Sequence, residues 1–558
     1  MSQSPPSNDP MTEEPDGSAP PGGRSRPWGI IEAPRVFVPA AFLVTLFVVV
    51  AVIFPDQLGE RLNDANNTVV QDLGWYYILV VTGFVAFSIW IALSPMGGIV
   101  LGKDDEDPEF GLKSWFAMLF AAGMCIGLVY WGVAEPLNHY ATPPPGTDVE
   151  QGSGEIARTA MDTTFLHWGL HAWSIYVVVG LAIAYAVHRK GHPISIRYAL
   201  KPLFGDRILG FWGDVLDIIA ILGTICGVAT SLGFGVTQVG GGLSYLGVVD
   251  EPSDGLLVLL IVVITSVALA SVVSGVDKGI RILSNINMGL AVVFVVCVLV
   301  LGPTVFLLSD FVSQIGSYLE SFLKLSFDVH PFEGNGKEWL AGWTTYYWGW
   351  WMSWAPFVGI FIARISRGRT VREFVAGVLL VPTMVTFLWF SVMGGSALYR
   401  EIFGEGGLIV DGAVNTDLAL FELLDGLPMS NLLSVAALVL IVIFFVTSSD
   451  SGSFVVDMLA SGGNLNPPVM TRAFWAALEG AVAIALLLAG GLAALQVAAI
   501  LVAVPFSIVM ILMVFATSKA LLGDHRHEQR LRRRWLAEQV AAEHAQLVEQ
   551  DRKDSSRG

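Results

Sequence analysis

Long apolar segments recur along the chain between residues 36 and 517, and short polar loops separate them. Each segment is close to the length of about 20 apolar residues that a helix needs to cross a bilayer. This pattern predicts an all-α membrane protein with twelve transmembrane helices. The expected spans are residues 36–54, 75–93, 115–138, 164–187, 208–246, 256–274, 288–308, 339–362, 375–398, 432–459, 473–489 and 492–517.

The charges of the loops agree with this count. With both termini in the cytoplasm, all but five of the 31 Lys and Arg residues fall on the cytoplasmic side. Cytoplasmic loops carry an excess of basic residues, so the skew supports twelve spans and predicts a multi-pass protein of the bacterial inner membrane. The five basic residues expected outside are Arg61, Arg158, Lys324, Lys337 and Arg400.

Composition excludes several other classes of protein. With 54% hydrophobic and 14% charged residues, the 558-residue chain holds more apolar sequence than a soluble core could bury. The net charge of −17 comes mainly from the amino-terminal tail and the outer loops, which indicates a solvated acidic surface and no nucleic-acid partner. Cys125, Cys226 and Cys297 all fall inside apolar spans, so they predict neither disulfides nor a metal site.

Three segments lie outside the expected spans. Residues 1–33 predict a disordered cytoplasmic tail, and residues 309–330 predict an amphipathic helix along the outer interface. Residues 523–558 predict a cytoplasmic helical tail, whose basic run beside Trp535 fits either a solvated helix or an arm that contacts anionic lipid. The run consists of Arg530, Arg532, Arg533 and Arg534.

Glycines interrupt the third expected span, where Gly123 and Gly127 flank the sequence Met-Cys-Ile. Backbone that leaves helical geometry inside a membrane is tolerated only where protein or a water-filled cavity satisfies its polar groups. A break therefore marks a candidate binding site. Close helix packing is the alternative explanation of these glycines.

Aromatic residues are concentrated in two spans. In the fourth span, Trp168, Trp173 and Tyr176 would fall within an arc of about 140° if the span is one helix. The face of a tryptophan ring attracts a desolvated ammonium by about 2 kcal/mol, and aromatic cages bind quaternary ammonium groups. An interfacial belt or core packing is the alternative. The eighth span carries Trp339, Trp343, Trp348, Trp350, Trp351 and Trp354, followed by Pro356.

The tenth span contains an unusually polar run, FFVTSSDSGS, at residues 444–453. Hydroxyl and carbonyl oxygens suit a hard alkali cation, whereas hydrogen bonding of Ser and Thr to their own helix is the alternative. Asp450 and, in the eleventh span, Glu479 are acids inside the membrane, which makes each a functional candidate. We find no phosphate-binding loop, zinc pattern or paired acid and base that would indicate an enzyme.

The chain resembles the betaine/carnitine/choline transporter (BCCT) family, most of all its sodium-coupled glycine betaine members, over almost its whole length except the tails. The resemblance implies a leucine-transporter-like fold: two leading helices in residues 34–98, then five-helix repeats of inverted topology in residues 111–308 and 336–520. The interrupted third and eighth spans, which open the repeats, agree with a midplane site. The segments that carry the resemblance are GMCIGLVYWGVAEP, FLHWGLHAWSIY, YYWGWWMSWAPFVGIFIARISRGR and FFVTSSDSGS.

The resemblance also implies roles for single residues. The substrate's aromatic box would be Trp168, Trp173, Tyr176 and Trp351, while Trp350 and Trp354 would line the route from outside. Cys125 replaces a family glycine near the substrate cavity. One sodium site would use Ala121, Met124, Phe444, Thr447 and Ser448. A second would use Thr224 and Phe357, but Val228 stands where the family has another threonine, which removes an oxygen.

The function implied is a sodium-coupled symporter that imports a compatible solute during osmotic stress, with sodium as the co-transported ion. Glycine betaine is the first candidate, and ectoine and proline are alternatives. A homotrimer is implied as well. The rival hypotheses are a sodium-independent choline or carnitine transporter or exchanger and, in a different class, an ion channel or membrane osmosensor. Exchangers of this family carry a fixed cationic side chain in place of the ion, and residues 208–249 contain no Lys or Arg.

Overall fold

The computed structural model describes residues 31–123, 126–149, 152–274 and 277–555, and these residues are nearly all helical. In these four segments no β-strand forms, although single bridges pair Val100 with Thr370 and Val410 with Ala413. The helices up to residue 245 are α1 (Pro34–Ile53), α2 (Pro55–Ala65), the π-helical turn η1 (Asn66–Val70), α3 (Gln71–Leu93), the 3-10 turn η2 (Pro95–Gly98), α4 (Leu112–Gly123), α5 (Ile126–Ala141), α6 (Gly154–Trp168), α7 (Leu170–Ala184), the π-helical turn η3 (Tyr185–Arg189), α8 (Ile196–Ala199), α9 (Lys201–Phe204), the 3-10 turn η4 (Gly205–Leu209) and α10 (Phe211–Tyr245).

The second part of the chain continues the helical pattern. Its helices are α11 (Asp254–Ser274), α12 (Asp277–Leu301), α13 (Thr304–Phe327), α14 (Gly336–Gly342), α15 (Thr344–Ile365), α16 (Val371–Phe403), α17 (Ala419–Asp425), α18 (Ser430–Ala460) and α19 (Val469–Ser555).

Local sequence fixes several of these helix starts. Proline at the first position begins α1 and α2, where its missing N–H costs nothing. Thr370 begins α16 with a capping box: its hydroxyl accepts a hydrogen bond from Glu373 N (3.1 Å), and the Glu373 carboxylate accepts one from Thr370 N (2.9 Å). This cap turns the chain sharply after the loop that follows α15.

Nine helical stretches of the described chain are long and apolar enough to cross a membrane. The twelve-span count stays a prediction, because the expected spans 115–138 and 339–362 are each divided between two helices, α4 with α5 and α14 with α15. The expected spans 473–489 and 492–517 both fall within α19, on either side of Gly490 and Gly491. Pro356 does not interrupt the eighth span as expected: α15 continues through it, and the break lies at Trp343.

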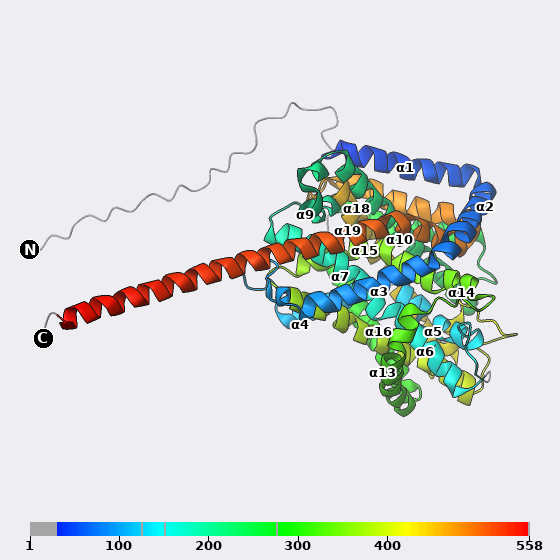
Figure 1. The fold of residues 1–558 in the computed structure, drawn as a ribbon. Helices are drawn as coiled ribbons and strands as arrows, with labels where there is room; N and C mark the ends of the chain where they lie inside the picture. The colour runs from blue at the N-terminus through cyan, green and yellow to red at the C-terminus, as the bar shows by residue number, and fades with distance from the viewer. Residues whose placement is uncertain (1–30, 124–125, 150–151, 275–276, 556–558) are drawn as a thin grey trace, which may run out of the picture.

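The helices differ strongly in how deeply they are enclosed. In the stretch formed by α6, α7 and η3, 89% of the most apolar window is buried, against 28% for α1 and 22% for α12. Figure 1 shows α1 along one edge of the bundle and α13 on the opposite side. We infer that α6 and α7 form the centre, whereas α1 and α12 lie at the periphery.

Small residues bring the central helices close together. Gly180 of α7 and Gly359 of α15 meet where the two helices cross, and a Cβ added at Gly359 would lie 2.6 Å from Val179 Cγ1. Close backbone approach through small residues is the usual device of helix packing in membranes. This crossing sets the aromatic residues of α7 against those of α15.

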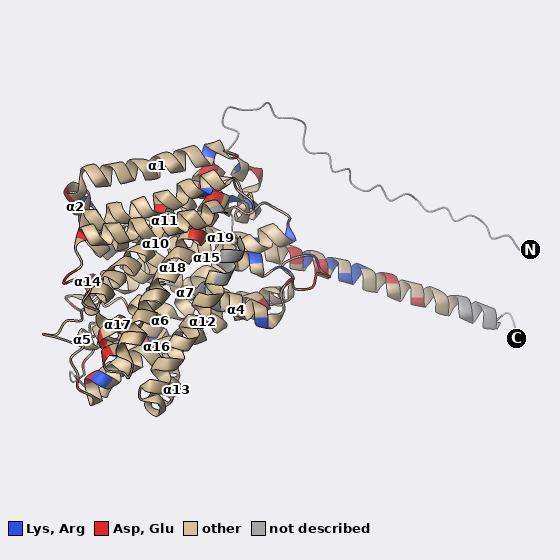
Figure 2. Cartoon of the chain, turned by 180° about the vertical axis from the view of Figure 1, so that it is seen from behind, with Lys and Arg blue, Asp and Glu red and all other residues tan. Residues whose placement is uncertain are grey.

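Helix α19 leaves the bundle as a long arm, red in Figure 1. Figure 2 shows Lys, Arg, Asp and Glu gathered where this arm departs and along it, while the helices of the bundle are mostly uncharged. The carboxylate of Asp524 at this point accepts hydrogen bonds from Lys190 Nζ (2.8 Å), Arg189 Nε (2.9 Å) and Tyr185 Oη (2.9 Å). These contacts fasten the base of the arm to η3.

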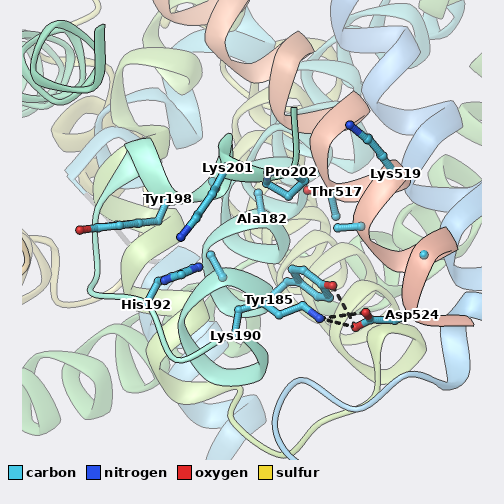
Figure 3. A pocket seen from close by; sticks show the side chains of 14 residues that line it. Ala182, Tyr185, Lys190, His192, Tyr198, Lys201, Pro202, Thr517, Lys519 and Asp524 are labelled. Atoms are coloured by element: carbon cyan, nitrogen blue, oxygen red, sulfur yellow. Dashed lines mark hydrogen bonds and ion pairs between the residues drawn. The ribbon is translucent and has the colours of Figure 1, made fainter. Parts of the chain in front are cut away.

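A cavity of about 320 Å³ opens beside this contact. Figure 3 shows Tyr185, Lys190 and Asp524, joined by their hydrogen bonds, among the residues that line it. The cavity lies at the end of the bundle and includes none of the aromatic residues that the sequence assigns to substrate.

Gly491 offers a test of the kink in α19. Its φ of 64° and ψ of −147° belong to a backbone region open essentially only to glycine, and no atom of another residue would meet an added Cβ. Gly491→Ala should therefore lower the free energy of unfolding by about 1–3 kcal/mol through backbone strain alone. Thermal unfolding of the detergent-purified protein, followed by tryptophan fluorescence, measures this loss.

Gly523→Ala is the matched control, because Gly523 lies in the helical part of α19 and also has open space around its Cβ position. It should be neutral or stabilising, since alanine favours a helix over glycine by about 1 kcal/mol. Equal melting temperatures for the two variants would contradict the assigned strain.

Candidate functional site

The fourth expected span is broken at Gly169, between α6 and α7. The prediction of one helix over residues 164–187 is therefore wrong, and so is the single arc drawn through its aromatic residues. Gly169 has φ −98° and ψ −134°, and an added Cβ would overlap the carbonyl oxygen of Phe165. The sequence of residues 164–187 contains no proline, so it gave no signal of this break.

Side chains of other helices satisfy the carbonyl groups next to the break. Trp351 Nε1 donates a hydrogen bond to the carbonyl oxygen of His167 (2.9 Å), and the Thr386 hydroxyl shares its hydrogen between the carbonyl of Trp168 (3.1 Å) and that of Thr383 in its own helix (2.9 Å). A break inside a membrane requires such partners. The indole of Trp351 thus has two roles, because it also contributes a ring to the site.

The four aromatic residues of the predicted box lie together and are buried. Trp351 joins the two halves: its ring centroid lies 4.9 Å from that of Trp168 and 6.4 Å from that of Tyr176, with interplanar angles of 73° and 71°. Tyr176 in turn meets Trp173 at 5.3 Å. The three ring pairs all meet edge to face, so the four rings form one buried aromatic cluster.

The neighbouring residues extend this aromatic cluster. Trp350 stacks on Trp351 at 4.5 Å, and a side chain at Gly127 of α5 would overlap the Trp350 ring. Gly127 thus brings the helix after the interrupted third span directly against the box. Trp354 lies one turn further along α15, 5.3 Å from Phe357. Cys125, which the resemblance places near the substrate, lies outside the described residues.

Glu135 binds Trp168 of the box, and it is not among the site residues predicted from the sequence. Its carboxylate is fully buried and accepts hydrogen bonds from Trp168 Nε1 (2.6 Å) and from the hydroxyl of Tyr347. His167 Nδ1 lies 2.7 Å from the other oxygen, and His139 Nε2 lies 3.4 Å from it. An acid inside an apolar span was the available signal.

Glu135, His139 and His167 could together hold a metal ion by type and proximity, since one ligand atom of each lies within 4.8 Å of the others. However, His167 Nε2 already lies 3.0 Å from Thr344 Oγ1, and both oxygens of Glu135 have partners. The arrangement is a hydrogen-bonded support that fixes the orientation of Trp168.

The described residues assigned to sodium lie on four helices of the bundle. The two hydroxyls bond within their own helices: Thr447 Oγ1 to the carbonyl of Ile443 (2.9 Å) and Thr224 Oγ1 to that of Ala220 (2.8 Å). Phe444, Thr447 and Ser448 lie in α18, Thr224 in α10 and Phe357 in α15. The backbone of Ala121 lies in α4, and Met124 falls outside the described residues. Both sodium sites stay predictions.

Comparison with known proteins decides the family. A family model described as "BCCT, betaine/carnitine/choline family transporter" matches residues 35–526. The chain belongs to the betaine/carnitine/choline transporter family. It is thus a transporter and, with its apolar helices, a multi-pass membrane protein.

Several relatives of this BCCT chain cover most of its length. An uncharacterised transporter of Mycobacterium tuberculosis is 51% identical over 513 residues, 91% of this chain and 86% of the relative. The glycine betaine transporter OpuD of Bacillus subtilis is 47% identical over 475 residues, 85% and 92% of the two chains. A glycine betaine transporter of Acinetobacter baylyi is 44% identical over 493 residues, 88% and 74% of the two chains.

Two variants of Glu135 test its role as a hydrogen-bond acceptor. Glu135→Ala leaves the buried donors of Trp168 and Tyr347 without an acceptor, so it should lower the free energy of unfolding by about 3 kcal/mol or more, at 1–3 kcal/mol for each donor. Glu135→Gln should lose only about 1 kcal/mol. Its amide oxygen can accept both bonds, and its NH₂ can donate to the other tautomer of His167.

Thermal unfolding of the two purified variants beside the unsubstituted protein checks this order. Equal losses would show that the charge of Glu135 matters, and that its hydrogen-bond geometry does not.

Proposed function

We propose that this transporter is a sodium-coupled symporter that imports a compatible solute with a quaternary ammonium group, glycine betaine being the first candidate. The observation that carries the proposal is the buried box of Trp168, Trp173, Tyr176 and Trp351 at the break between α6 and α7. Two relatives that cover most of the chain are named glycine betaine transporters.

The box suits a cation that cannot donate hydrogen bonds. A trimethylammonium group gains about 2 kcal/mol from a desolvated tryptophan face and needs no acceptor oxygen. Glu135 meets Trp168 at its N–H edge, so its charge does not occupy a ring face. A site of ring faces therefore favours a quaternary ammonium over a primary amine, which would leave N–H donors unpaired.

Sodium coupling rests on a different part of the chain. Phe444, Thr447 and Ser448 place a carbonyl and two hydroxyls on one stretch of α18, and oxygen ligands suit a hard cation. Residues 208–249 offer no cationic side chain that could replace the ion. The proposal extends to import under osmotic stress, to a homotrimer and to contact of the basic arm of α19 with anionic lipid.

A sodium-independent choline or carnitine transporter is the second candidate. A glycine betaine/proline/choline transporter of Vibrio parahaemolyticus is 40% identical over 514 residues, so related chains carry names with several substrates. The aromatic box recognises the ammonium group and does not distinguish these ligands by their other ends. Val228 also removes one oxygen from the second sodium site.

Uptake by reconstituted protein tests the proposal. Labelled glycine betaine is added to proteoliposomes with and without an inward sodium gradient, and unlabelled ectoine, proline, choline or carnitine competes. We expect saturable uptake that the sodium gradient drives and that glycine betaine inhibits most strongly. Uptake that ignores sodium but accelerates with preloaded substrate would identify an exchanger, and non-saturable flux would identify a channel.

A pair of tryptophan variants tests the box itself. Trp351→Phe and Trp389→Phe each remove a buried indole N–H bonded to a backbone carbonyl at 2.9 Å, that of His167 and that of Leu128 respectively. Only Trp351 belongs to the box. Trp351→Phe should raise the Kd for glycine betaine about fivefold, which corresponds to about 1 kcal/mol.

Isothermal titration calorimetry in saturating sodium measures both Kd values, with melting temperatures as a measure of the shared loss of one hydrogen bond. An equal change of Kd in the two variants would remove Trp351 from the substrate site.

A further inference from the structure

Glu479 is a fully buried acid that the proposed transport mechanism does not use. It lies in the part of α19 before the kink at Gly490, and its side chain has no solvent exposure. Neither carboxyl oxygen has a hydrogen-bond partner among the described residues. A charged carboxylate in such a position costs far more than a neutral one, and buried acids without a partner take up a proton instead.

Apolar residues of two neighbouring helices lie beside Glu479. Gly452 of α18 and Val228 of α10 meet there: a Cβ added at Gly452 would lie 3.0 Å from Val228 Cγ2 and 3.3 Å from Glu479 Oε1. Beside the next residue, Gly480, lies Thr265 of α11, which carries a hydroxyl. Hard metal cations take six or more oxygen ligands, whereas Val228 presents methyl groups on the side of Glu479 that faces Gly452. This chemistry fits a proton.

The charged groups around Glu479 form a short series along α18 and α19. Asp450 of α18 lies 2.8 Å from Arg472 Nη2 of α19. Arg472 lies seven residues before Glu479 in α19, which is about 10 Å along the helix. Val228 of α10, which meets Glu479 at Gly452, and Thr265 of α11, which lies beside Gly480, do not titrate.

The positive charge of Arg472 is thus committed to Asp450. The side chain of Arg472 is 17% exposed, so this pair lies nearer to solvent than Glu479 does. Asp457, further along α18, is bound by Thr471 Oγ1 at 2.8 Å.

We propose that Glu479 is a proton-binding site inside the helical bundle, at the junction of α10, α18 and α19, and that it is occupied in this conformation. Helix movements that separate α10, α18 and α19 would admit water to Glu479 and release its proton. Transport would then be linked to pH by a group that touches neither substrate nor sodium. The step is a proton binding equilibrium and needs no co-reactant.

Infrared difference spectroscopy tests the occupied site without any substrate. The full-length protein in lipid vesicles at neutral pH is compared with Glu479→Gln, which has the shape of a protonated acid. We expect the wild-type side of the difference to show the C=O band of a carboxylic acid, shifted in D₂O. Carboxylate bands in its place would overturn the proposal. Glu528→Gln, on the exposed part of the same helix, is the control and should show carboxylate bands only.

Glu479→Asp provides a second variant if the Gln variant fails to fold, because it keeps a carboxyl whose band shifts in frequency. A shift of the acid band supports the assignment, and an unchanged band assigns it to another residue.

Proton exchange during binding tests the link to transport. Glycine betaine and sodium are added to weakly buffered protein with a pH-sensitive dye, and we expect a proton signal from wild type and Glu528→Gln that Glu479→Gln loses. A signal of equal size in all three proteins would overturn the link. The infrared result does not depend on the substrate, so failure of the proposed function and failure of the proton site are distinguishable.

Discussion

The backbone polar groups at the break between α6 and α7 need partners inside a membrane, and the centre of this transporter depends on how they obtain them. Gly169 ends one helix, and the carbonyls of His167 and Trp168 receive donors from Trp351 and Thr386. Because one of these donors is itself a box ring, the repair of the backbone and the construction of the box are one arrangement. Gly180 and Gly359 permit it by letting α7 and α15 approach closely.

A second layer supports this centre through Glu135. Four side chains contact this carboxylate. They are Trp168, Tyr347, His139 and His167. Two buried donors on one carboxylate, the indole N–H of Trp168 and the hydroxyl of Tyr347, specify the orientation of both side chains. We infer that the fold itself fixes the orientation of the Trp168 ring.

The helical, membrane-spanning character of the chain could be predicted from the sequence, because a helix needs about 20 apolar residues to cross a bilayer. The sequence also named four aromatic residues that the structure brings together, and their role in binding substrate stays a prediction. The break at Gly169 could not be predicted, since glycine is common in membrane helices and only the distant carbonyl partners reveal its role. Pro356 misled in the opposite direction, because α15 accommodates it. The network of Glu135 joins residues as far apart in sequence as Tyr347, and spacing along the chain contains no trace of it.

The arm of α19 has a mechanical consequence. From Asp524, where Lys190 and Arg189 hold it, the helix continues to Ser555, a length of about 45 Å at 1.5 Å for each residue. A rotation of about 5° at its base would carry the far end through about 4 Å, given that length. A small rotation of the bundle at Asp524 would therefore produce a much larger displacement at the far end of the arm.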